Sequence, residues 1–356
     1  MSHLLLVVNP GSTSTKAAIF RDHEELASKN INHSAADLAQ FSGVIDQLEL
    51  RYKKIDEFIK ENNYSVSDFQ AIVGRGGLLK PIPSGTYQVD VAMVKDLQSE
   101  SYGSHAANLG ALIALNFAKQ ADISAFIVDP VVVDELADVA RITGRPEITR
   151  RSLFHALNQK AVAKRYALQN GKKYADLNLV IAHMGGGVSI GCHEKGRVVE
   201  VNNTLDGEGP MSPERAGTVQ AKSFAELIFK ENWDMKKISK ALAGHGGILA
   251  HLGTTDVREV EKMIASGDEK AKLVLDGMLY QVARYIGAGA VVVKGKVDQI
   301  ILTGGIAHSA YVVQKLKEHT EFIAPITVFP GEDELKALAE GALRVLTGVE
   351  EAKVYL

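Results

Sequence analysis

Residues 4–20 read LLLVVNPGSTSTKAAIF. Five apolar residues run into Asn9 and a Pro-Gly turn, hydroxyl side chains follow, and a second apolar run closes the stretch. This pattern predicts a strand, a tight turn and a second strand. The hydroxyls of Ser12 and Ser14 and the ammonium of Lys16, beside glycine backbone N–H groups, suit a bound phosphate. For this stretch alone, a Ser/Thr-rich hairpin turn without a ligand has about equal weight.

Length and composition limit the classes of protein that remain. The chain has 356 residues, a length that suggests about two domains. Its net charge of −3 gives no basic field for nucleic acid or an anionic membrane, so a small anion needs a local site. One cysteine, Cys192, excludes an intrachain disulfide framework and a multi-thiolate metal site. With no signal peptide or membrane segment in the sequence, we expect a cytoplasmic protein.

The opening pattern returns in the second half of the chain. From Leu177 the sequence LNLVIAHMGGGVSIGCHEKGRVVEVNN predicts a strand, a glycine-rich turn at residues 185–187 and two further strands. This is an architectural repeat at low residue identity, and it predicts two related domains that face each other across one cleft. A strand, not a helix, follows the glycines, so a dinucleotide site is rejected.

Three further candidates follow predicted strands or open helices in the first half. Arg75 lies among three glycines after a short strand at residues 71–73, where its guanidinium suits a carboxylate or phosphate. Asp129 ends the predicted strand 125–129 and is a candidate for Mg²⁺ or proton transfer, with a turn cap as the alternative. His105 falls in the opening turns of a helix predicted over 101–119, where a structural role is the commoner one.

The second half adds loops of the same kind. Arg215 lies in a turn-rich loop, and mostly helical sequence spans residues 224–286. A strand at 298–306 runs into Gly304 and Gly305, which suit a nucleotide base or ribose against bare backbone. Three acids at 332–334 open a helix that ends near Leu346. No P-loop, G-x-S-x-G elbow, H-E-x-x-H motif or kinase catalytic loop is present in the sequence.

Five motifs in this order resemble the acetate and butyrate kinase family, which lies within the actin, sugar kinase and Hsp70 superfamily. The resemblance spans nearly the whole chain and is nearest to the butyrate kinase subgroup. It rests on NPGSTSTK at 9–16, AHMGGGVSIG at 182–191, NNTLDGEGPMSPERAG at 202–217, TGGIA at 303–307 and PGEDELKALAEGALR at 330–344. It is supported by DPVVVDELADVARITGRPEITRRSLFHALNQKA at 129–161.

The resemblance implies an α/β fold of two duplicated ribonuclease-H-like domains, the actin-like ATPase fold, with an interdomain cleft. The expected first domain is 1–150 plus 331–356, on the carboxylate and phosphate side. The second is 151–330, on the nucleotide side, with a helical insertion at about 218–290. The implied reaction is reversible phosphoryl transfer between ATP and a short-chain fatty acid, giving an acyl phosphate and ADP with Mg²⁺. A homodimer or an assembly of dimers is also implied, for which the apolar helical stretch 272–293 could supply an interface or could equally be core.

The resemblance also implies roles for individual residues. Arg215, His183, Asp129 and His105 take catalytic roles, with Arg215 and His183 acting on the moving phosphoryl group. The carboxylate anchor is Arg75 with Gly76 and Gly77, although acetate kinases place their arginine on the strand before the paired glycines. The residues implied to contact phosphate and nucleotide are Asn9, Ser12, Ser14, Lys16, Gly185, Gly186, Gly187, Gly304, Gly305 and Ile306. The metal is expected near Asn9, Asp129 and one of the acids Glu332, Asp333 and Glu334, with Glu332 and Glu334 as the glutamate candidates.

These residue types fit the chemistry. Phosphoryl transfer needs cations and N–H donors around the phosphoryl oxygens and in-line positioning, and the carboxylate acceptor is already an anion at pH 7. Because acyl phosphates hydrolyse, domain closure is the expected device that excludes water. The preferred acid and the physiological direction stay open. The alternatives are an acetate or propionate kinase, a sugar or polyol kinase, and a non-enzymatic actin- or Hsp70-like ATP-binding module.

Overall fold

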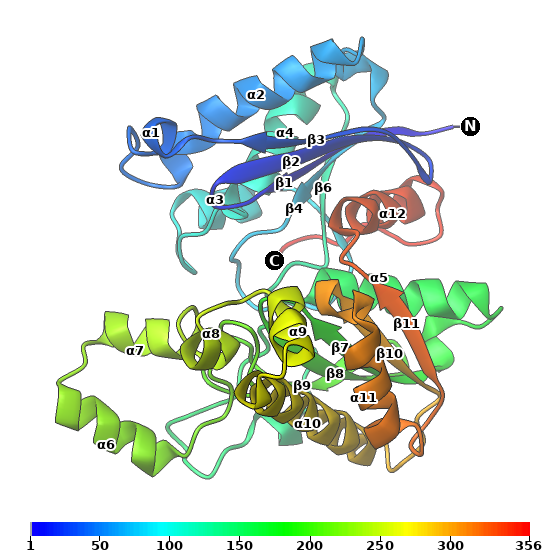
Figure 1. Ribbon diagram of the computed structural model, residues 1–356. Helices are drawn as coiled ribbons and strands as arrows, with labels where there is room; N and C mark the ends of the chain where they lie inside the picture. The colour runs from blue at the N-terminus through cyan, green and yellow to red at the C-terminus, as the bar shows by residue number, and fades with distance from the viewer. Residues whose placement is uncertain (1) are drawn as a thin grey trace. The chain divides into compact units, whose positions relative to one another are not determined.

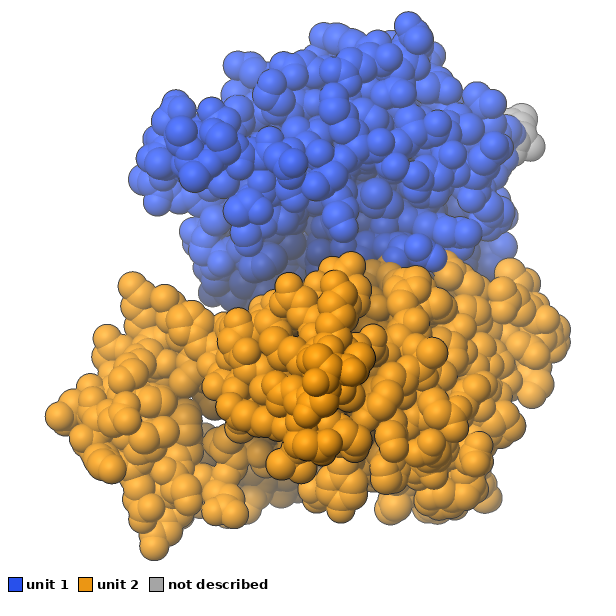
Figure 2. Space-filling view, in the orientation of Figure 1, with its two compact units in different colours: residues 1–133, 333–356 blue, residues 134–332 orange. Residues whose placement is uncertain are grey.

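The computed structural model describes residues 2–356 and divides into two compact units. Unit 1 comprises residues 1–133 with 333–356, and unit 2 comprises residues 134–332 (Figure 2). Each unit is a β-sheet covered by helices (Figure 1).

The sheet of unit 1 has the strand order β3-β2-β1-β4-β6-β5. β1 pairs antiparallel with β2 and parallel with β4, and β4 pairs parallel with β6. Every residue of β1 is buried, as expected for a central strand that is covered on both faces. The strands are β1 Leu4–Pro10, β2 Ser14–Arg21, β3 Glu24–Asn32, β4 Ala71–Arg75, β5 Thr86–Gln88 and β6 Ser124–Val128.

Helices pack the sheet of unit 1 into one apolar core. Alternate β1 side chains, Leu4, Leu6 and Val8, lie in the core cluster that α2 and α4 complete. α12 also packs on the sheet, where its Gly341 lies against Val128. The helices are α1 Ala35–Leu38, α2 Leu48–Glu61, α3 Val91–Gln98, α4 Asn108–Ala121 and α12 Glu334–Leu346.

The contact of α4 with β4 needs glycine on both elements. A Cβ on Gly74 would lie 2.1 Å from the Gly110 carbonyl oxygen, and one on Gly110 would lie 2.3 Å from the Arg75 carbonyl oxygen. Both neighbours are backbone atoms that cannot rotate away. The glycine pair therefore sets how closely α4 approaches the strand that carries Arg75.

We expect Gly110→Ala to destabilise unit 1 by about 1–3 kcal/mol, because the new methyl group must push α4 away from β4. Calorimetry should show a lower apparent Tm, by about 2–4 °C per kcal/mol. Gly287→Ala is the matched control in helix α10, since its Cβ would meet nothing within 4 Å. That control should leave the Tm unchanged or raise it, because alanine favours helix over glycine. Equal Tm values for the two variants would contradict the close-approach argument.

The sheet of unit 2 repeats that of unit 1. Its order, β11-β10-β7-β8-β9, places β7, β8, β9, β10 and β11 where β1, β2, β3, β4 and β6 lie in unit 1. The parallel and antiparallel pairings also match. This correspondence confirms the duplication that the sequence predicted. The strands are β7 Asn178–Met184, β8 Val188–Glu194, β9 Arg197–Val201, β10 Gln299–Gly304 and β11 Ile326–Pro330.

Unit 2 has a second set of helices between β9 and β10. α10 supplies much of the core with β7, β8 and β10, and no residue of α6 or α7 is buried. α10 is thus core along one face, while Leu273, Tyr280 and Val291 on it are exposed. The helices are α5 Ala156–Gln169, α6 Ala221–Glu231, α7 Met235–Leu242, α8 Gly247–Leu252, α9 Val257–Ala265, α10 Glu269–Val292 and α11 Ala310–Thr320.

The structure differs from the sequence predictions in several elements. The helix predicted over 101–119 begins only at Asn108, so His105 lies in the turn before α4 and not within the helix. β3 has no counterpart in the predictions because it is a mostly exposed strand without an apolar run.

The division between units also differs from the boundary expected at residue 150. Residues 134–150 belong to unit 2, where Glu135 pairs with the buried Lys160 at 2.6 Å. Arg150 pairs with Glu200 at 2.6 Å and also with Glu208. These ion pairs attach the arginine-rich segment 141–151 to unit 2. In residues 2–356, no helix is long and apolar enough to cross a membrane.

Candidate active site

In unit 1, three predicted site residues meet at the ends of β1 and β4 and the start of α12. The amide nitrogen of Asn9 donates to Glu334 Oε2 at 2.7 Å, and Arg75 donates to Asn9 Oδ1 at 3.2 Å. Arg75 also forms an ion pair with Glu334 Oε1 at 3.1 Å. Glu334 is therefore the acid of 332–334 that joins the unit 1 cluster, although it lies far from Asn9 in the sequence.

The loop between β1 and β2 is held by a residue that the sequence predictions missed. Arg51 on α2 is fully buried and donates to the carbonyl oxygens of Gly11 and Ser14, at 2.8 and 3.0 Å, and to that of Ser12 at 3.2 Å. These carbonyl oxygens accept hydrogen bonds from Arg51 and therefore point toward the guanidinium. They do not repel an anion bound on the opposite side of the loop. Ser12 and Lys16 are exposed and Ser14 is half-buried, so the polar groups expected to contact phosphate remain accessible.

The other predicted residues of unit 1 lie near this cluster. Asp129 follows β6 in a left-handed conformation, with φ of 37°, and its Oδ1 accepts the Gly85 N–H at 2.6 Å. Gly76 lies against Pro130, and Gly77 lies against the backbone of α4 at its first residue, Asn108. The side chain of His105 is exposed at the surface, and partial desolvation, together with the charge of Arg75, lowers the pKa of its imidazole, which is therefore neutral at pH 7.

In unit 2, the glycine loop at 185–187 and Arg215 are in contact. A Cβ on Gly187 would lie 1.9 Å from an Arg215 terminal nitrogen, so the guanidinium rests directly on the loop backbone. Ser212 donates to the Gly186 carbonyl at 2.7 Å and accepts the Arg215 N–H at 3.2 Å. The sequence SPER therefore forms a tight turn that fixes Arg215 against the glycines.

Arg215 is a poorly solvated cation. Burial lowers the pKa of its guanidinium, and the charge of Glu214 acts in the opposite direction, yet arginine stays protonated in proteins. One terminal nitrogen donates to the Thr204 carbonyl at 3.3 Å. Within residues 2–356, no carboxylate forms an ion pair with this guanidinium. A half-buried cation without an ionic partner stabilises negative charge that arrives with a ligand.

His183 lies at the end of β7 among polar side chains of unit 2. Its Nδ1 is 2.8 Å from Asn158 Oδ1, and its Nε2 is 3.3 Å from Glu332 Oε1. Within the described chain, this buried Nε2 makes no hydrogen bond. The ring of His155 stacks on that of His183, with centroids 3.8 Å apart. A buried, unsatisfied ring nitrogen beside a glycine loop suits a phosphate oxygen.

The remaining predicted residues of unit 2 lie on the neighbouring strand. β10 runs parallel to β7, with Thr303 opposite His183, so both strands end at the same edge of the sheet. Gly304 pairs with Gly331 through two backbone hydrogen bonds of 3.1 and 3.0 Å. Gly305 and Ile306 begin a 3₁₀ turn there. The glycines expected to contact nucleotide and the carboxylate of Glu332 thus share the edge where the strands of α/β sheets keep their ligands.

Both units carry side-chain oxygen atoms of the kind that bind Mg²⁺. This ion commonly binds proteins through one or two carboxylates and takes its other ligands from substrate phosphates and water. Asn9, Asp129 and Glu334 in unit 1 offer oxygen atoms of this kind, and Glu332 does so in unit 2. Within the described residues, no group of three or more His, Cys, Asp or Glu side chains is arranged to hold a metal by itself. The residues therefore fit an ion that arrives with a nucleotide.

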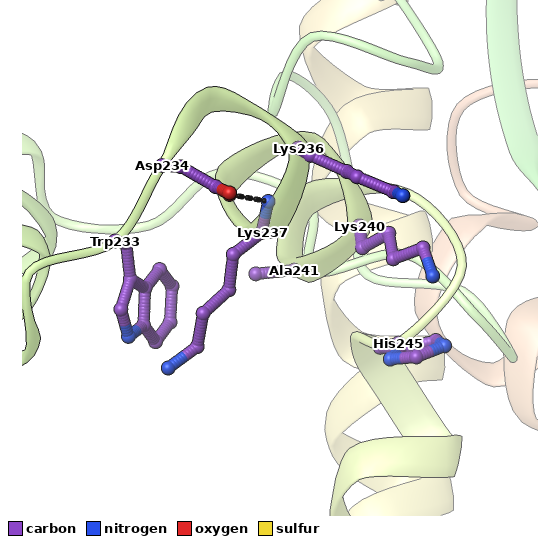
Figure 3. A pocket seen from close by; sticks show the side chains of 7 residues that line it. All are labelled: Trp233, Asp234, Lys236, Lys237, Lys240, Ala241 and His245. Carbon is purple, nitrogen blue, oxygen red and sulfur yellow. Dashed lines mark hydrogen bonds between the residues drawn. The ribbon is translucent and has the colours of Figure 1, made fainter.

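A surface pocket of about 520 Å³ lies elsewhere, on α7 and its flanking loops (Figure 3). Trp233 forms one wall, with Lys237 4.5 Å from its ring centroid. Lys236, Lys240 and His245 line the opposite side. The segment that follows is tied to the Arg215 loop, since Gly244 and Gly246 both donate to the Glu214 carbonyl, at 2.8 and 3.1 Å. None of the predicted site residues lines this pocket.

Sequence reasoning missed three polar residues of this site: Arg51, Asn158 and His155. Arg51 lies in the charged sequence of α2, where an arginine is expected on the solvated face of the helix. A signal existed for the other two, because the sequence FHALNQ places His155 and Asn158 three positions apart, one helical turn, at the start of α5. Only the pairing of α5 with β7 shows that both face His183.

Solved structures with similar folds include an acetate kinase from Porphyromonas gingivalis, with a TM-score of 0.75, 18% identity and coverage of 98% of this chain and 100% of that one. A propionate kinase from Francisella tularensis has a TM-score of 0.76, 19% identity and coverage of 96% and 99%. At this identity the likeness shows the fold alone. The chain therefore has the actin-like ATPase fold, as the sequence predicted.

The sequence comparisons give the family. The acetokinase family model matches residues 140–328, which is more than half of the chain. "Butyrate kinase 2" of Clostridium acetobutylicum is 49% identical over 355 residues, and the match covers 100% of both chains. A "Probable butyrate kinase" of Enterococcus faecalis is 50% identical over 351 residues, covering 99% of this chain and 97% of that one. The chain belongs to the acetokinase family.

Proposed function

We propose that the chain is an ATP-dependent kinase of short-chain fatty acids, with butyrate or a branched analogue as the acceptor. A carboxylate oxygen of the acid forms a bond to the γ-phosphorus of ATP while the bond from that phosphorus to the ADP oxygen breaks. The products are an acyl phosphate and ADP, and the reaction is reversible. The main support is identity of about half over the full length to proteins named butyrate kinases.

The geometry of unit 2 supports phosphoryl transfer to a carboxylate. Arg215 lies on the backbone of Gly187, and His183 ends the strand that leads into the same loop. A cation and a ring nitrogen beside exposed backbone can stabilise charge on the transferred phosphoryl group. The carboxylate acceptor needs no strong general base, and this makes a sugar or polyol kinase a poorer fit. We propose Gly304, Gly305 and Ile306 as contacts of the nucleotide.

In unit 1, we propose that Ser12, Ser14 and Lys16 contact phosphate, and that Arg75, with Gly76 and Gly77, anchors the substrate carboxylate. Asn9, Asp129 and Glu334 would hold Mg²⁺, with Glu332 the corresponding acid of unit 2. When bound, this ion neutralises phosphate charge and orients the nucleotide. The neutral imidazole of His105 can donate one hydrogen bond without adding a second charge beside Arg75.

The function is tested with purified protein, Mg·ATP and hydroxylamine, which traps an acyl phosphate as a hydroxamate. The values of kcat/KM for acetate, propionate, butyrate and isobutyrate should be highest for butyrate or isobutyrate. A maximum at acetate or propionate would assign the chain to those kinases instead. If the protein bound ATP but formed no hydroxamate with any of the four acids, the result would favour a non-enzymatic ATP-binding module.

We expect Glu334→Gln to lower kcat/KM for Mg·ATP by about 10- to 100-fold, a cost common for residues that position or bind a metal. The substitution removes the charge that pairs with Arg75 but keeps an oxygen that can accept from Asn9. The measurement is kcat/KM as a function of Mg²⁺ concentration, where higher Mg²⁺ should recover part of the loss. Glu340→Gln, on the same helix, is the control and should behave as the unsubstituted protein. Full activity of Glu334→Gln at low Mg²⁺ would exclude Glu334 from the metal site.

We also propose that the protein acts in the cytoplasm as a homodimer or an assembly of dimers. The support is the family resemblance for the assembly, and the single buried Cys192 for a reducing compartment. Sedimentation velocity tests the assembly, and a monomer at micromolar concentration would contradict it.

A further inference from the structure

A chain of side-chain hydrogen bonds in unit 2 leads to the stacked histidines. Tyr174 Oη is 2.7 Å from His193 Nδ1, and His193 Nε2 is 3.0 Å from Gln159 Oε1. The Gln159 amide nitrogen is 2.9 Å from Ser189 Oγ, which is 2.8 Å from His155 Nδ1. Gln159, Ser189 and His193 are all fully buried. The chain thus joins Tyr174 to the ring that stacks on His183.

The orientation of the Gln159 amide is fixed by a backbone group. Its nitrogen donates to the Ser189 carbonyl oxygen at 3.1 Å, and a carbonyl oxygen can only accept. Oε1 of Gln159 must therefore face His193, and as an acceptor it requires a proton on His193 Nε2. Burial and the charge of Lys160 hold the pKa of His193 well below its ordinary value, so the ring carries that one proton. His193 Nδ1 then accepts from the Tyr174 hydroxyl.

The same reasoning extends to His155. Ser189 Oγ accepts from the Gln159 amide nitrogen, so the Ser189 hydroxyl proton is available for His155 Nδ1. With that proton donated, His155 Nδ1 is the acceptor and the ring proton lies on Nε2. Each hydrogen bond of this chain then joins a donor to an acceptor, as buried polar groups require.

Asn158 requires a proton on His183 Nδ1, whereas His155 Nδ1 accepts a hydrogen bond. The Asn158 amide nitrogen donates to the Glu332 carbonyl oxygen at 3.2 Å, so its Oδ1 accepts from His183 Nδ1. The two stacked rings, 3.8 Å apart with an interplanar angle of 12°, therefore use Nδ1 in opposite ways: His183 Nδ1 donates to Asn158, and His155 Nδ1 accepts from Ser189.

We propose that Gln159 is a positioning residue for the kinase reaction: through Ser189 it fixes His155 in the tautomer with the proton on Nε2, and through the stacked ring it orients His183. This proposal rests on the proposed function for its effect on rate. Gln159 transmits the constraint because its amide carries both an acceptor and a donor, which a purely apolar or purely anionic side chain lacks.

The backbone leaves room for this glutamine. A Cβ on Gly191, in β8, would lie 2.3 Å from Gln159 Oε1 and 3.2 Å from His193 Nε2. Only a residue without a side chain lets the Gln159 amide bridge His193 and Ser189 at this point of the sheet. The close approach shows that packing, and not only hydrogen bonding, holds the amide in place.

The first test observes the tautomer directly in the resting protein. Protein labelled with ¹⁵N at its 11 histidines gives imidazole nitrogen resonances that distinguish protonated from unprotonated nitrogens. The His155 signals are assigned as those lost in His155→Gln. We expect a protonated Nε2 and an unprotonated Nδ1 in the unsubstituted protein. Gln159→Met and Ser189→Ala should both shift His155 toward a mixture of tautomers. An Nδ1-protonated ring in the unsubstituted protein would overturn the proposal.

The second test is kinetic. We expect Gln159→Met to lower kcat by about 10- to 100-fold, in the range typical of residues that orient a ligand-contacting histidine. KM for Mg·ATP and for the acid should change by less than about threefold, because Gln159 contacts neither. Ser189→Ala breaks the same connection to His155 with a smaller loss of volume, so it can be measured if Gln159→Met does not fold. An unchanged kcat in both variants would overturn the positioning role.

Gln299→Met is the matched control. Gln299 is also buried in unit 2, and its Oε1 accepts a hydrogen bond from a ring-bearing residue, the Tyr166 hydroxyl, at 2.9 Å. It has no hydrogen bond to Ser189 or His155 among those of the described residues. This variant should keep both the His155 tautomer and kcat, and a loss equal to that of Gln159→Met would assign the effect to general destabilisation. If the unsubstituted protein phosphorylated no acid, the proposed function would fail, while the tautomer measurement would still decide the positioning network.

Discussion

Arg215→Ala is expected to lower kcat by about 10³-fold or more while it leaves the affinity for nucleotide largely intact. Arginines that stabilise the charge of a transferring phosphoryl group are worth effects of this size. The side chain of Arg215 is half-buried, lies on the Gly187 backbone and has the Thr204 carbonyl as a weak partner at 3.3 Å. Because it is poorly solvated before the reaction, it needs little reorganisation when charge develops.

The measurement separates rate from binding. Hydroxamate formation gives kcat, and calorimetric titration gives the dissociation constant of Mg·ADP. Arg284→Ala removes an exposed arginine of the same unit and should change neither quantity. Gly187→Ala should resemble Arg215→Ala in kcat, since its methyl group would occupy the position of the guanidinium. A normal kcat in Arg215→Ala would exclude this arginine from the transition state.

Arg51→Met is expected to lower both the free energy of unfolding and kcat/KM for Mg·ATP. Three loop carbonyls, the Thr15 hydroxyl and Gln47 would each lose their bond to the guanidinium, and buried acceptors left unpaired cost about 1–3 kcal/mol each. Partial relaxation of the loop reduces the total, for which we expect about 3–5 kcal/mol. The apparent Tm should fall by roughly 10 °C.

The loss at Arg51 should extend to catalysis because the loop carries Ser12 and Ser14. Without the guanidinium, the loop carbonyls can turn toward the side on which phosphate is expected, and kcat/KM for Mg·ATP should fall by about 100-fold. The measurement is made well below the lowered Tm, so that the folded protein is assayed. Arg21→Met, at the exposed end of the same strand pair, should alter neither Tm nor kcat/KM. Normal kcat/KM in a destabilised Arg51→Met would restrict Arg51 to a structural role.

Much of the fold could be predicted from the sequence because the central strands have strong local signals. β1 and β7 are continuous apolar runs that end in glycine-containing turns, and this pattern predicted both halves of the duplication. The edge strand β3 and the start of α4 could not be predicted in this way. β3 has mostly exposed side chains, and the turn that holds His105 is defined by contacts such as that of Asn108 with the Leu78 N–H, at 2.8 Å.

Some residues of the candidate site could likewise be selected from the sequence, and others could not. The glycine loops, Arg75 and Arg215 were selected from local patterns, because loops after buried strands need glycine and because an arginine beside them suits an anion. The role of each residue remains a proposal that the variants above test. Which acid of 332–334 joins Asn9 could not be determined from the sequence. The structure places Glu334, at the start of α12, beside Asn9, whereas Glu332 belongs to unit 2.

The sequence by itself determined the strand and turn order of two related units and the positions of their glycine loops, since these follow from hydrophobic patterning over a few neighbouring residues. Only the tertiary structure decided that Arg51 supports the first loop, that Glu334 pairs with Arg75, and that Gln159 connects His193 to Ser189. Each of these contacts joins residues far apart in the chain. Their partners are set by burial, because a polar group removed from water must find a donor or acceptor wherever the packed fold provides one.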